Sequence, residues 1–266
     1  MSRPSRSRFA LLGLFVPVSL VLGGCSSPAR PELTDPTAII TAALKATEGV
    51  KSVHLDLTVE GSINADLFGT GDAGAALTLT GTSLSADVDM TGGNMHATFA
   101  IPALLGLTGE LIQIGTTSYM KTSLGGPLFE VTEDSTGELP IDPANPTAIV
   151  DGLGDFLLND AVNPVKGEDV ECGNAKCYAV TIELTPEALA ALDPTGAAAG
   201  ELPIDLSAGT ATITVRVDKN TYRLAGISVV AAAGDQGSLT LELTLSKWDE
   251  TLTIAAPPAD QLAPAS

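Results

Sequence analysis

The residue with the clearest chemistry in this 266-residue chain is Cys25, which follows an apolar run and two glycines. An arginine-rich start precedes the run over residues 9–22, which is shorter than the ~20 residues that a membrane-spanning helix needs. The run ends in Leu22-Gly23-Gly24-Cys25, the order of a lipobox. Small residues let a peptidase reach the backbone, and a cysteine thiolate is the nucleophile that can take a lipid. The pattern predicts a signal peptide over residues 1–24 and lipidation of Cys25.

Lipidation would anchor the chain to the cell membrane on its extracytoplasmic side. More than one acyl chain at Cys25 would hold the protein there without help from the folded body, because a single chain binds only marginally. Residues 25–34 contain Pro and Ser and are predicted to form a lipidated tether. A single domain is expected over residues 35–258, followed by a flexible tail over 259–266.

The charge of the chain limits its partners. Cleavage after residue 24 would leave 10 Lys and Arg residues against 32 Asp and Glu residues, a formal charge of −22. Nucleic acid is excluded as a partner, because no basic patch exists to replace the counterions of phosphates. The same acidity disfavours a folded body that lies flat on an anionic membrane.

Two further cysteines, Cys172 and Cys177, enclose the turn-like sequence Gly173-Asn174-Ala175-Lys176. Outside the cytosol a disulfide is the default state of such a pair. The residues after Cys177 have strand character, so we expect a hairpin with a disulfide across its neck. A zinc site is disfavoured, because no second Cys or His pair lies nearby.

Hydropathy patterns predict a protein of many strands and few helices. Asp35 and Pro36 are a cap and a first helical residue, and apolar residues then recur at helical spacing up to Gly49. Two further helices are expected around 149–157 and 185–192. Alternation of apolar and polar residues predicts antiparallel strands with one apolar face, over 53–59, 77–79, 84–90, 95–101, 111–114, 118–122, 178–184, 211–218, 223–232, 238–248 and 251–254.

Catalytic patterns are missing from the sequence. The chain has two histidines, His54 and His96, and both fall on the polar phase of a strand. The nucleophile-elbow and zinc-protease motifs do not occur. Gly69-Thr70-Gly71-Asp72-Ala73-Gly74 matches a dinucleotide fingerprint by letters, but a strand follows it, so no helix N-terminus is offered to a phosphate. We therefore expect no enzyme activity, no cofactor and no metal site.

About ten strands expose a broad apolar face that three helices would not cover. Such a sheet must close into a barrel, pair with a second sheet or curl around something. The apolar residues are mostly aliphatic, since aromatic residues are only 4% of the chain. An aliphatic lining suits flexible acyl chains, while an ordinary packed core remains the alternative.

Two stretches of the chain resemble the LppX/LprA/LprF/LprG family of actinobacterial lipoproteins. They are Val50-Lys51-Ser52-Val53-His54-Leu55-Asp56-Leu57-Thr58-Val59 at the first strand and Leu243-Thr244-Leu245-Ser246-Lys247-Trp248-Asp249-Glu250 near the end. The resemblance implies an α+β fold in which a curved antiparallel half-barrel sheet wraps around a few helices, similar to the LolA/LolB carriers. It also implies a hydrophobic cavity that holds the acyl tails of lipids or glycolipids, and so a membrane-anchored carrier that moves them across the cell envelope.

The lining of that cavity is expected to come from the apolar phases of the strands. An enclosed volume well above the roughly 1,000 Å³ of the largest ordinary ligand pockets would favour a lipid with several acyl chains. The alternative function is a scaffold or sensor lipoprotein with a solid core, which binds an envelope protein such as a membrane transporter. The predicted lipid-binding residues are Val53, Leu55, Leu57, Val59, Leu84, Val88, Phe99, Ile101, Ile213, Val215, Leu241 and Leu243.

Overall fold

The computed structural model describes residues 30–64, 76–133, 154–159, 162–186, 188, 209–234 and 237–264. Contacts divide the chain into two compact units, Met1–Arg30 and Pro31–Ser266, and the following description concerns the second. The predicted signal peptide and Cys25 lie outside the described residues. Among the described residues, no helix is long and apolar enough to cross a membrane.

Helix α1 (Pro36–Thr47) begins where its sequence predicts. The Asp35 carboxylate accepts a hydrogen bond from the Ala38 backbone N–H at 2.8 Å, and Pro36 occupies the first turn. This satisfies one of the free N–H groups at the helix start. One side of the helix is fully buried through Ile39 and Ile40. The chain then turns at Gly49, whose φ of +73° is easily adopted only by glycine.

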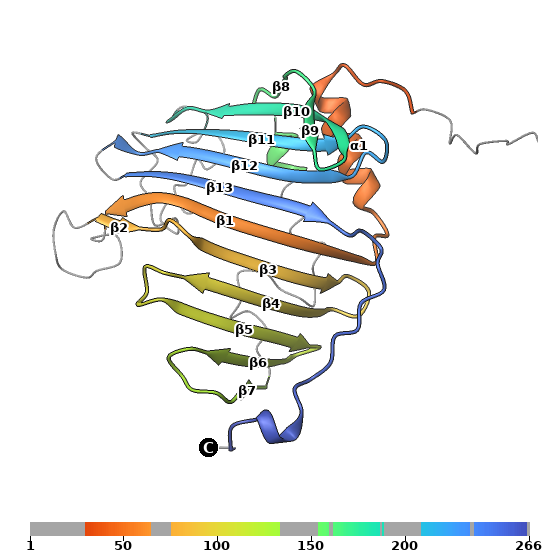
Figure 1. Cartoon of the computed structure of the whole chain (residues 1–266). Coiled ribbons are helices and arrows are strands. Elements are labelled where there is room, and N and C mark those ends of the chain that lie inside the picture. Colours follow the sequence, from red (N-terminus) through yellow and green to blue (C-terminus); the bar gives the residue numbers. More distant parts are fainter. Residues whose placement is uncertain are drawn as a thin grey trace, which may run out of the picture. The chain divides into compact units, whose positions relative to one another are not determined.

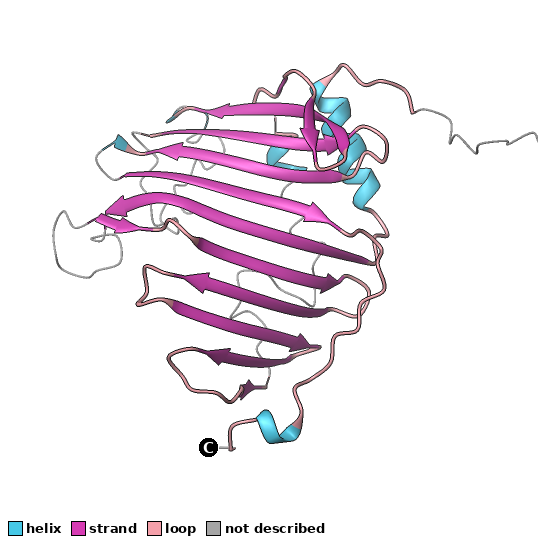
Figure 2. Cartoon of the chain, in the orientation of Figure 1, coloured by secondary structure: helices cyan, strands magenta, loops and turns pink. Residues whose placement is uncertain are grey.

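Most of the described chain is one sheet of thirteen strands, paired antiparallel throughout (Figures 1 and 2). Its path is β7-β6-β5-β4-β3-β1-β13-β12-β11-β10-β8, with β2 beside β1 and β9 beside β10. The strands are β1 (Ser52–Asn64), β2 (Ala76–Thr78), β3 (Thr82–Asp89), β4 (Asn94–Ile101), β5 (Leu107–Ile114), β6 (Thr117–Thr122), β7 (Glu130–Thr132), β8 (Val165–Lys166), β9 (Val170–Cys172), β10 (Ala175–Leu184), β11 (Thr210–Asp218), β12 (Leu224–Ala232) and β13 (Gly237–Ser246).

The sheet is open and curved, with β7 and β8 at the two ends of its path (Figure 1). Strand β1 lies in the middle, where it pairs with β3 on one side and with β13 on the other. The first and last long strands are therefore neighbours, although about 180 residues separate them along the chain. Of the arrangements that the sequence left open, the structure adopts the sheet that curls without closing.

Helix α1 packs on one face of this sheet, against β10, β11 and β12. A core cluster forms between them, in which Ile40, Val180 and Val215 are almost completely buried. Residues 154–157 are also helical, and Leu157 joins the same cluster. The rest of the helix predicted around 149–157 and most of the one predicted over 185–192 lie outside the described residues.

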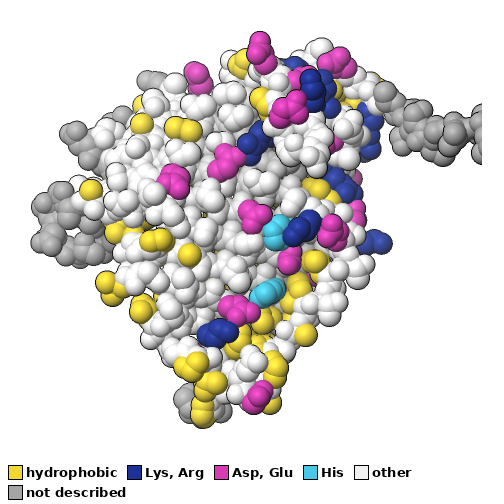
Figure 3. Space-filling view, in the orientation of Figure 1, with side chains coloured by type: hydrophobic (Ala, Val, Ile, Leu, Met, Phe, Trp, Pro, Cys, Tyr) yellow, Lys and Arg dark blue, Asp and Glu magenta, His cyan; other side chains and the backbone are white. Residues whose placement is uncertain are grey.

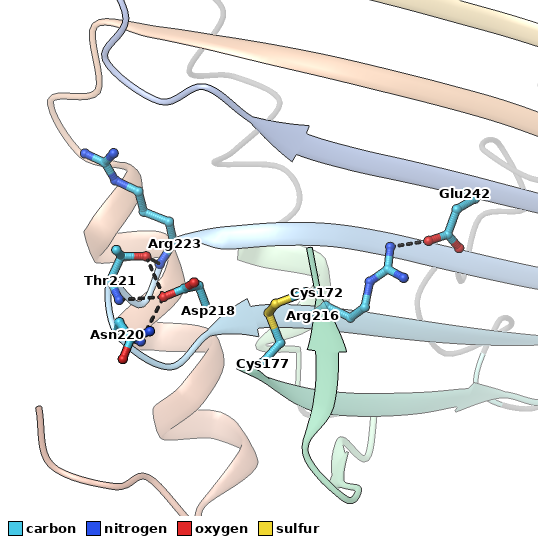
Figure 4. The surroundings of a disulfide bond; sticks show 8 residues. All are labelled: Cys172, Cys177, Arg216, Asp218, Asn220, Thr221, Arg223 and Glu242. Atoms are coloured by element: carbon cyan, nitrogen blue, oxygen red, sulfur yellow. Dashed lines mark hydrogen bonds and ion pairs between the residues drawn. A yellow bond between two sulfur atoms is a disulfide. The ribbon is translucent and has the colours of Figure 1, made fainter. Parts of the chain in front are cut away.

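The predicted disulfide hairpin is confirmed. Cys172 in β9 and Cys177 in β10 are bonded, with their Cα atoms 5.9 Å apart (Figure 4). The neighbouring turn between β11 and β12 begins at Asp218. The Asp218 carboxylate accepts hydrogen bonds from the backbone N–H groups of Asn220 and Thr221 (Figure 4), a turn chemistry typical of Asp.

One prediction about the end of the chain was wrong. Residues 251–254 alternate in hydropathy but form no strand, because β13 is already paired on both sides and no other described strand lies beside them. Part of the segment predicted as a flexible tail contacts the chain just before β7. Phe129 donates a backbone hydrogen bond to Gln261 and accepts one from Ala263, both at 2.8 Å. This contact buries the Phe129 side chain and covers the end of the sheet at β7.

Candidate functional site

Register between the strands places all twelve predicted lining residues on the face that α1 also contacts, here called the apolar face. Leu57 pairs with Leu84 on one side and with Leu243 on the other. Further rows repeat this arrangement, for example Val59 with Leu241. Because side chains alternate between the two faces of a strand, each row continues across the sheet with the same orientation. The rows also contain Val53, Leu55, Val88, Phe99, Ile101, Ile213 and Val215.

Burial divides the apolar face into a part under α1 and a part away from α1, and the second part holds its own core cluster around Val53, Val88 and Met95. The part under α1 is filled, since Val180, Ile182 and Val215 are at most 1% exposed. Around β1, β3, β4 and β13 the side chains are mostly half-buried. Nine of the twelve predicted residues are half-buried, and only Val53, Val88 and Val215 are fully buried. The apolar face away from α1 is therefore less completely buried than the part under the helix.

A cavity of about 200 Å³ lies between α1 and the strands β1, β11, β12 and β13, and its walls are almost wholly apolar. Val53, Val215 and Leu243 are the predicted residues that line it. The other lining residues are Ile40, Ala43, Leu44, Thr47, Met90, Leu157, Leu224, Ile227, Leu245 and Trp248. The enclosed volume is below the roughly 300–1,000 Å³ of ordinary ligand pockets, so the described residues do not enclose a lipid with several acyl chains.

An outer pocket of about 630 Å³ adjoins the cavity, because both are lined by Leu44, Thr47 and Met90. Its remaining walls are more polar and include Glu48 and Asp155. An apolar cavity beside a pocket that carries some polar groups fits an amphipathic ligand, since the tail loses water contact inside while the head keeps it outside.

Trp248 closes one side of the cavity, and sequence reasoning did not select it. The Arg223 guanidinium lies over its ring, 5.7 Å from the centroid, and forms an ion pair with Asp249. Lys247 and Asp249, on either side of Trp248, have φ angles of 49° and 61°. This left-handed conformation costs non-glycine residues roughly 1 kcal/mol each. Such backbone strain is concentrated at functional positions in proteins.

The Asp249 carboxylate holds this corner in place. The backbone N–H of Lys51 donates to it at 2.8 Å. This hydrogen bond, followed by that from Arg223, lowers the pKa of Asp249 below its ordinary value of 3.8. The folded state therefore favours the charged carboxylate.

Replacement of Asp249 by Asn should lower the urea midpoint of unfolding at neutral pH. Because the folded pKa of Asp249 is depressed, its contribution is fully present above the unfolded pKa near 3.8 and is lost as the pH falls through the folded value. Urea titrations of both proteins across that range should show the two midpoints converging in acid. A difference between the two urea midpoints that stays constant with pH would mean that the charge of Asp249 does not contribute to stability.

The opposite, polar face carries the two histidines, each beside carboxylates. His54 Nδ1 lies 2.6 Å from Asp87 and its Nε2 lies 3.2 Å from Asp56, while His96 Nε2 lies 3.0 Å from Glu110. Among the described residues, no group of three or more His, Cys, Asp or Glu side chains is placed to hold a metal ion. The contacts with Asp87 and Glu110 are cross-strand pairs of a solvated sheet face, whereas His54 and Asp56 both belong to β1.

Comparisons with known proteins agree with this architecture. No family model matches the chain. Over 258 residues it is 25% identical to the lipoarabinomannan carrier protein LprG of Mycobacterium tuberculosis and of Mycobacterium bovis, an alignment that covers 94% of this chain and 95% of the relative.

Two solved structures share the fold. Lipoprotein LppX from Mycobacterium tuberculosis is 17% identical, with a TM-score of 0.50, and the match covers 82% of this chain and 97% of that one. LprF from Mycobacterium bovis is 20% identical, with a TM-score of 0.53, covering 84% and 96%. The predicted resemblance to this group of lipoproteins is therefore confirmed, as is the curved antiparallel sheet.

Proposed function

We propose that the chain is a membrane-anchored lipoprotein that binds the acyl chains of lipids or glycolipids on its apolar face and carries them across the cell envelope. The observation that carries the proposal is the half-buried row of aliphatic residues that leads into the apolar cavity. The relatives support it, because LprG is named a lipoarabinomannan carrier protein. Extraction of the cargo from a membrane would be passive.

The energetics favour partial burial of the cargo. At about 0.8 kcal/mol for each methylene, complete burial of a sixteen-carbon chain would contribute roughly 12 kcal/mol. Two or three such chains would exceed the practical limit of noncovalent affinity, near 18–21 kcal/mol. A carrier must release its cargo. A shallow apolar face with a small cavity therefore suits transport better than a deep cavity that buries the acyl chains completely. The lining selects for apolar volume because it offers few polar partners.

The test is mass spectrometry of an organic extract from the protein beginning at Ser26, purified without detergent from its native host. Pro31–Ser266 is a compact unit of its own, so this form keeps the whole sheet. We expect acylated lipid in near-stoichiometric amount. Protein free of lipid, together with a single crosslinked envelope protein, would favour the scaffold function instead.

A further inference from the structure

Four exposed leucines gather at one end of the sheet, and we call them the leucine rim. Leu104 and Leu105 lie in the turn between β4 and β5 and are 47% and 91% exposed. Leu124 and Leu128 lie in the loop between β6 and β7 and are 64% and 37% exposed. Hydrophobic side chains mark this lower left edge of the molecule in Figure 3. Single exposed leucines are ordinary, whereas a group of four marks an interaction site.

Hydrogen bonds hold the two segments of the rim together. The Ser123 N–H donates to the Thr108 carbonyl at 2.8 Å, and the Thr108 N–H donates to the Ser123 hydroxyl at 3.0 Å. Within the first turn, the N–H of Gly106 donates to the carbonyl of Pro102 at 3.0 Å. Leu105 itself has a φ of 56°, so the turn holds this side chain outward at a local conformational cost. The leucines are therefore presented in a fixed arrangement, and binding through them orders little chain.

Charge is absent from both segments of the rim. Residues 99–109 and 122–129 contain no Lys, Arg, His, Asp or Glu, although the chain has a net charge of −19. A protein partner would normally meet polar groups that fix its orientation. The rim offers almost only aliphatic carbon, for which the interior of a bilayer is the matching partner. Contact through this edge also keeps the acidic body away from anionic head groups.

The rim is continuous with the apolar face. Phe99 and Ile101 of β4 belong to that face, and Ile101 pairs with Leu107 of β5 immediately beside the turn that carries Leu104 and Leu105. All three are half-buried. We propose that the leucine rim docks into a lipid bilayer and joins the apolar face to the membrane interior. The docking stands on the exposed leucines, while its use for loading acyl chains rests on the proposed function.

Flotation with phosphatidylcholine vesicles tests the docking, with the protein that begins at Ser26 and lacks the acyl anchor. The double replacement of Leu105 and Leu124 by Ser should reduce the partition coefficient between vesicles and water at least tenfold. Each of the two replacements removes an aliphatic side chain that would otherwise be buried in hydrocarbon. Val165→Ser is the matched control, because Val165 is 56% exposed on β8, at the other end of the sheet path. This control should bind as the unaltered protein does. Circular dichroism should show all three folded.

Vesicles that also contain phosphatidylglycerol should bind less protein at low salt, because the body is acidic. Equal partition of the double variant and the control would overturn the docking, as would no measurable flotation of the unaltered protein. Lipid recovery from the same samples separates the two proposals. If the Leu105 and Leu124 double variant retains lipid but no longer floats with the vesicles, the docking is supported. If the unaltered protein contains no lipid but floats through its leucines, only the carrier function is refuted.

Discussion

Replacement of Leu243 by Asn is expected to reduce acyl-chain affinity by roughly thirtyfold or more. Leu243 lies between Leu57 and Ile227 on the apolar face and lines the cavity. The amide would lose its water on ligand binding and find no partner in the cavity, which costs about 1–3 kcal/mol. Lost contact with the acyl chain adds to that cost.

The neighbouring residue supplies the control. Thr244 points to the polar face and is exposed, so Thr244→Asn makes the same chemical change outside the cavity. Trp248 is the only tryptophan of the chain and lines the same cavity, so its fluorescence should report entry of an acyl chain directly. Titration with a fatty alcohol should give weaker binding for Leu243→Asn alone. Equal affinities for both variants would place the ligand elsewhere.

Replacement of Cys25 by Ser should abolish incorporation of labelled palmitate and the membrane retention that depends on it. The chain has three cysteines, and Cys172 and Cys177 are bonded to each other. Cys25 is thus the one thiol left to carry an acyl chain. Because each buried methylene contributes about 0.8 kcal/mol, loss of the acyl chains removes far more free energy than any surface contact supplies.

Ser26→Ala is the control for this experiment, since it changes the adjacent residue and retains the thiol. It should label with palmitate as the unaltered protein does. Labelling that persists after loss of Cys25 would contradict the predicted anchor.

Local patterns in the sequence predicted local structure well. The Asp35-Pro36 start of α1 follows from capping chemistry, and the alternation around Leu55 and Leu57 assigns their face because side chains on a strand have a period of two. Once neighbouring strands are antiparallel and in register, such residues share one face. The twelve predicted lining residues could therefore be placed on a common face without knowledge of which strands pair, although only Val53, Val215 and Leu243 line the cavity.

Pairing between distant segments could not be predicted in the same way. Alternation gives each strand a face but no partner, so neither the β1 and β13 contact nor the bridge from Phe129 to Leu262 is visible locally. Residues 251–254 show the converse, an alternating stretch that has no partner. Trp248 was missed because its place beside the cavity depends on Arg223, which is distant in the sequence and lies over the tryptophan ring only in the fold.

The central position of β1 between β3 and β13 has a consequence for how the protein is made. During synthesis, β1 emerges early but lacks one neighbour until the chain beyond residue 237 has followed. Closing such long-range contacts is slow, so the nascent polypeptide stays without its complete native sheet until nearly all of it has been made. A chain exported as its lipobox predicts would gain time from this order of strands, because its sheet could be completed only after the last long strand had crossed the membrane.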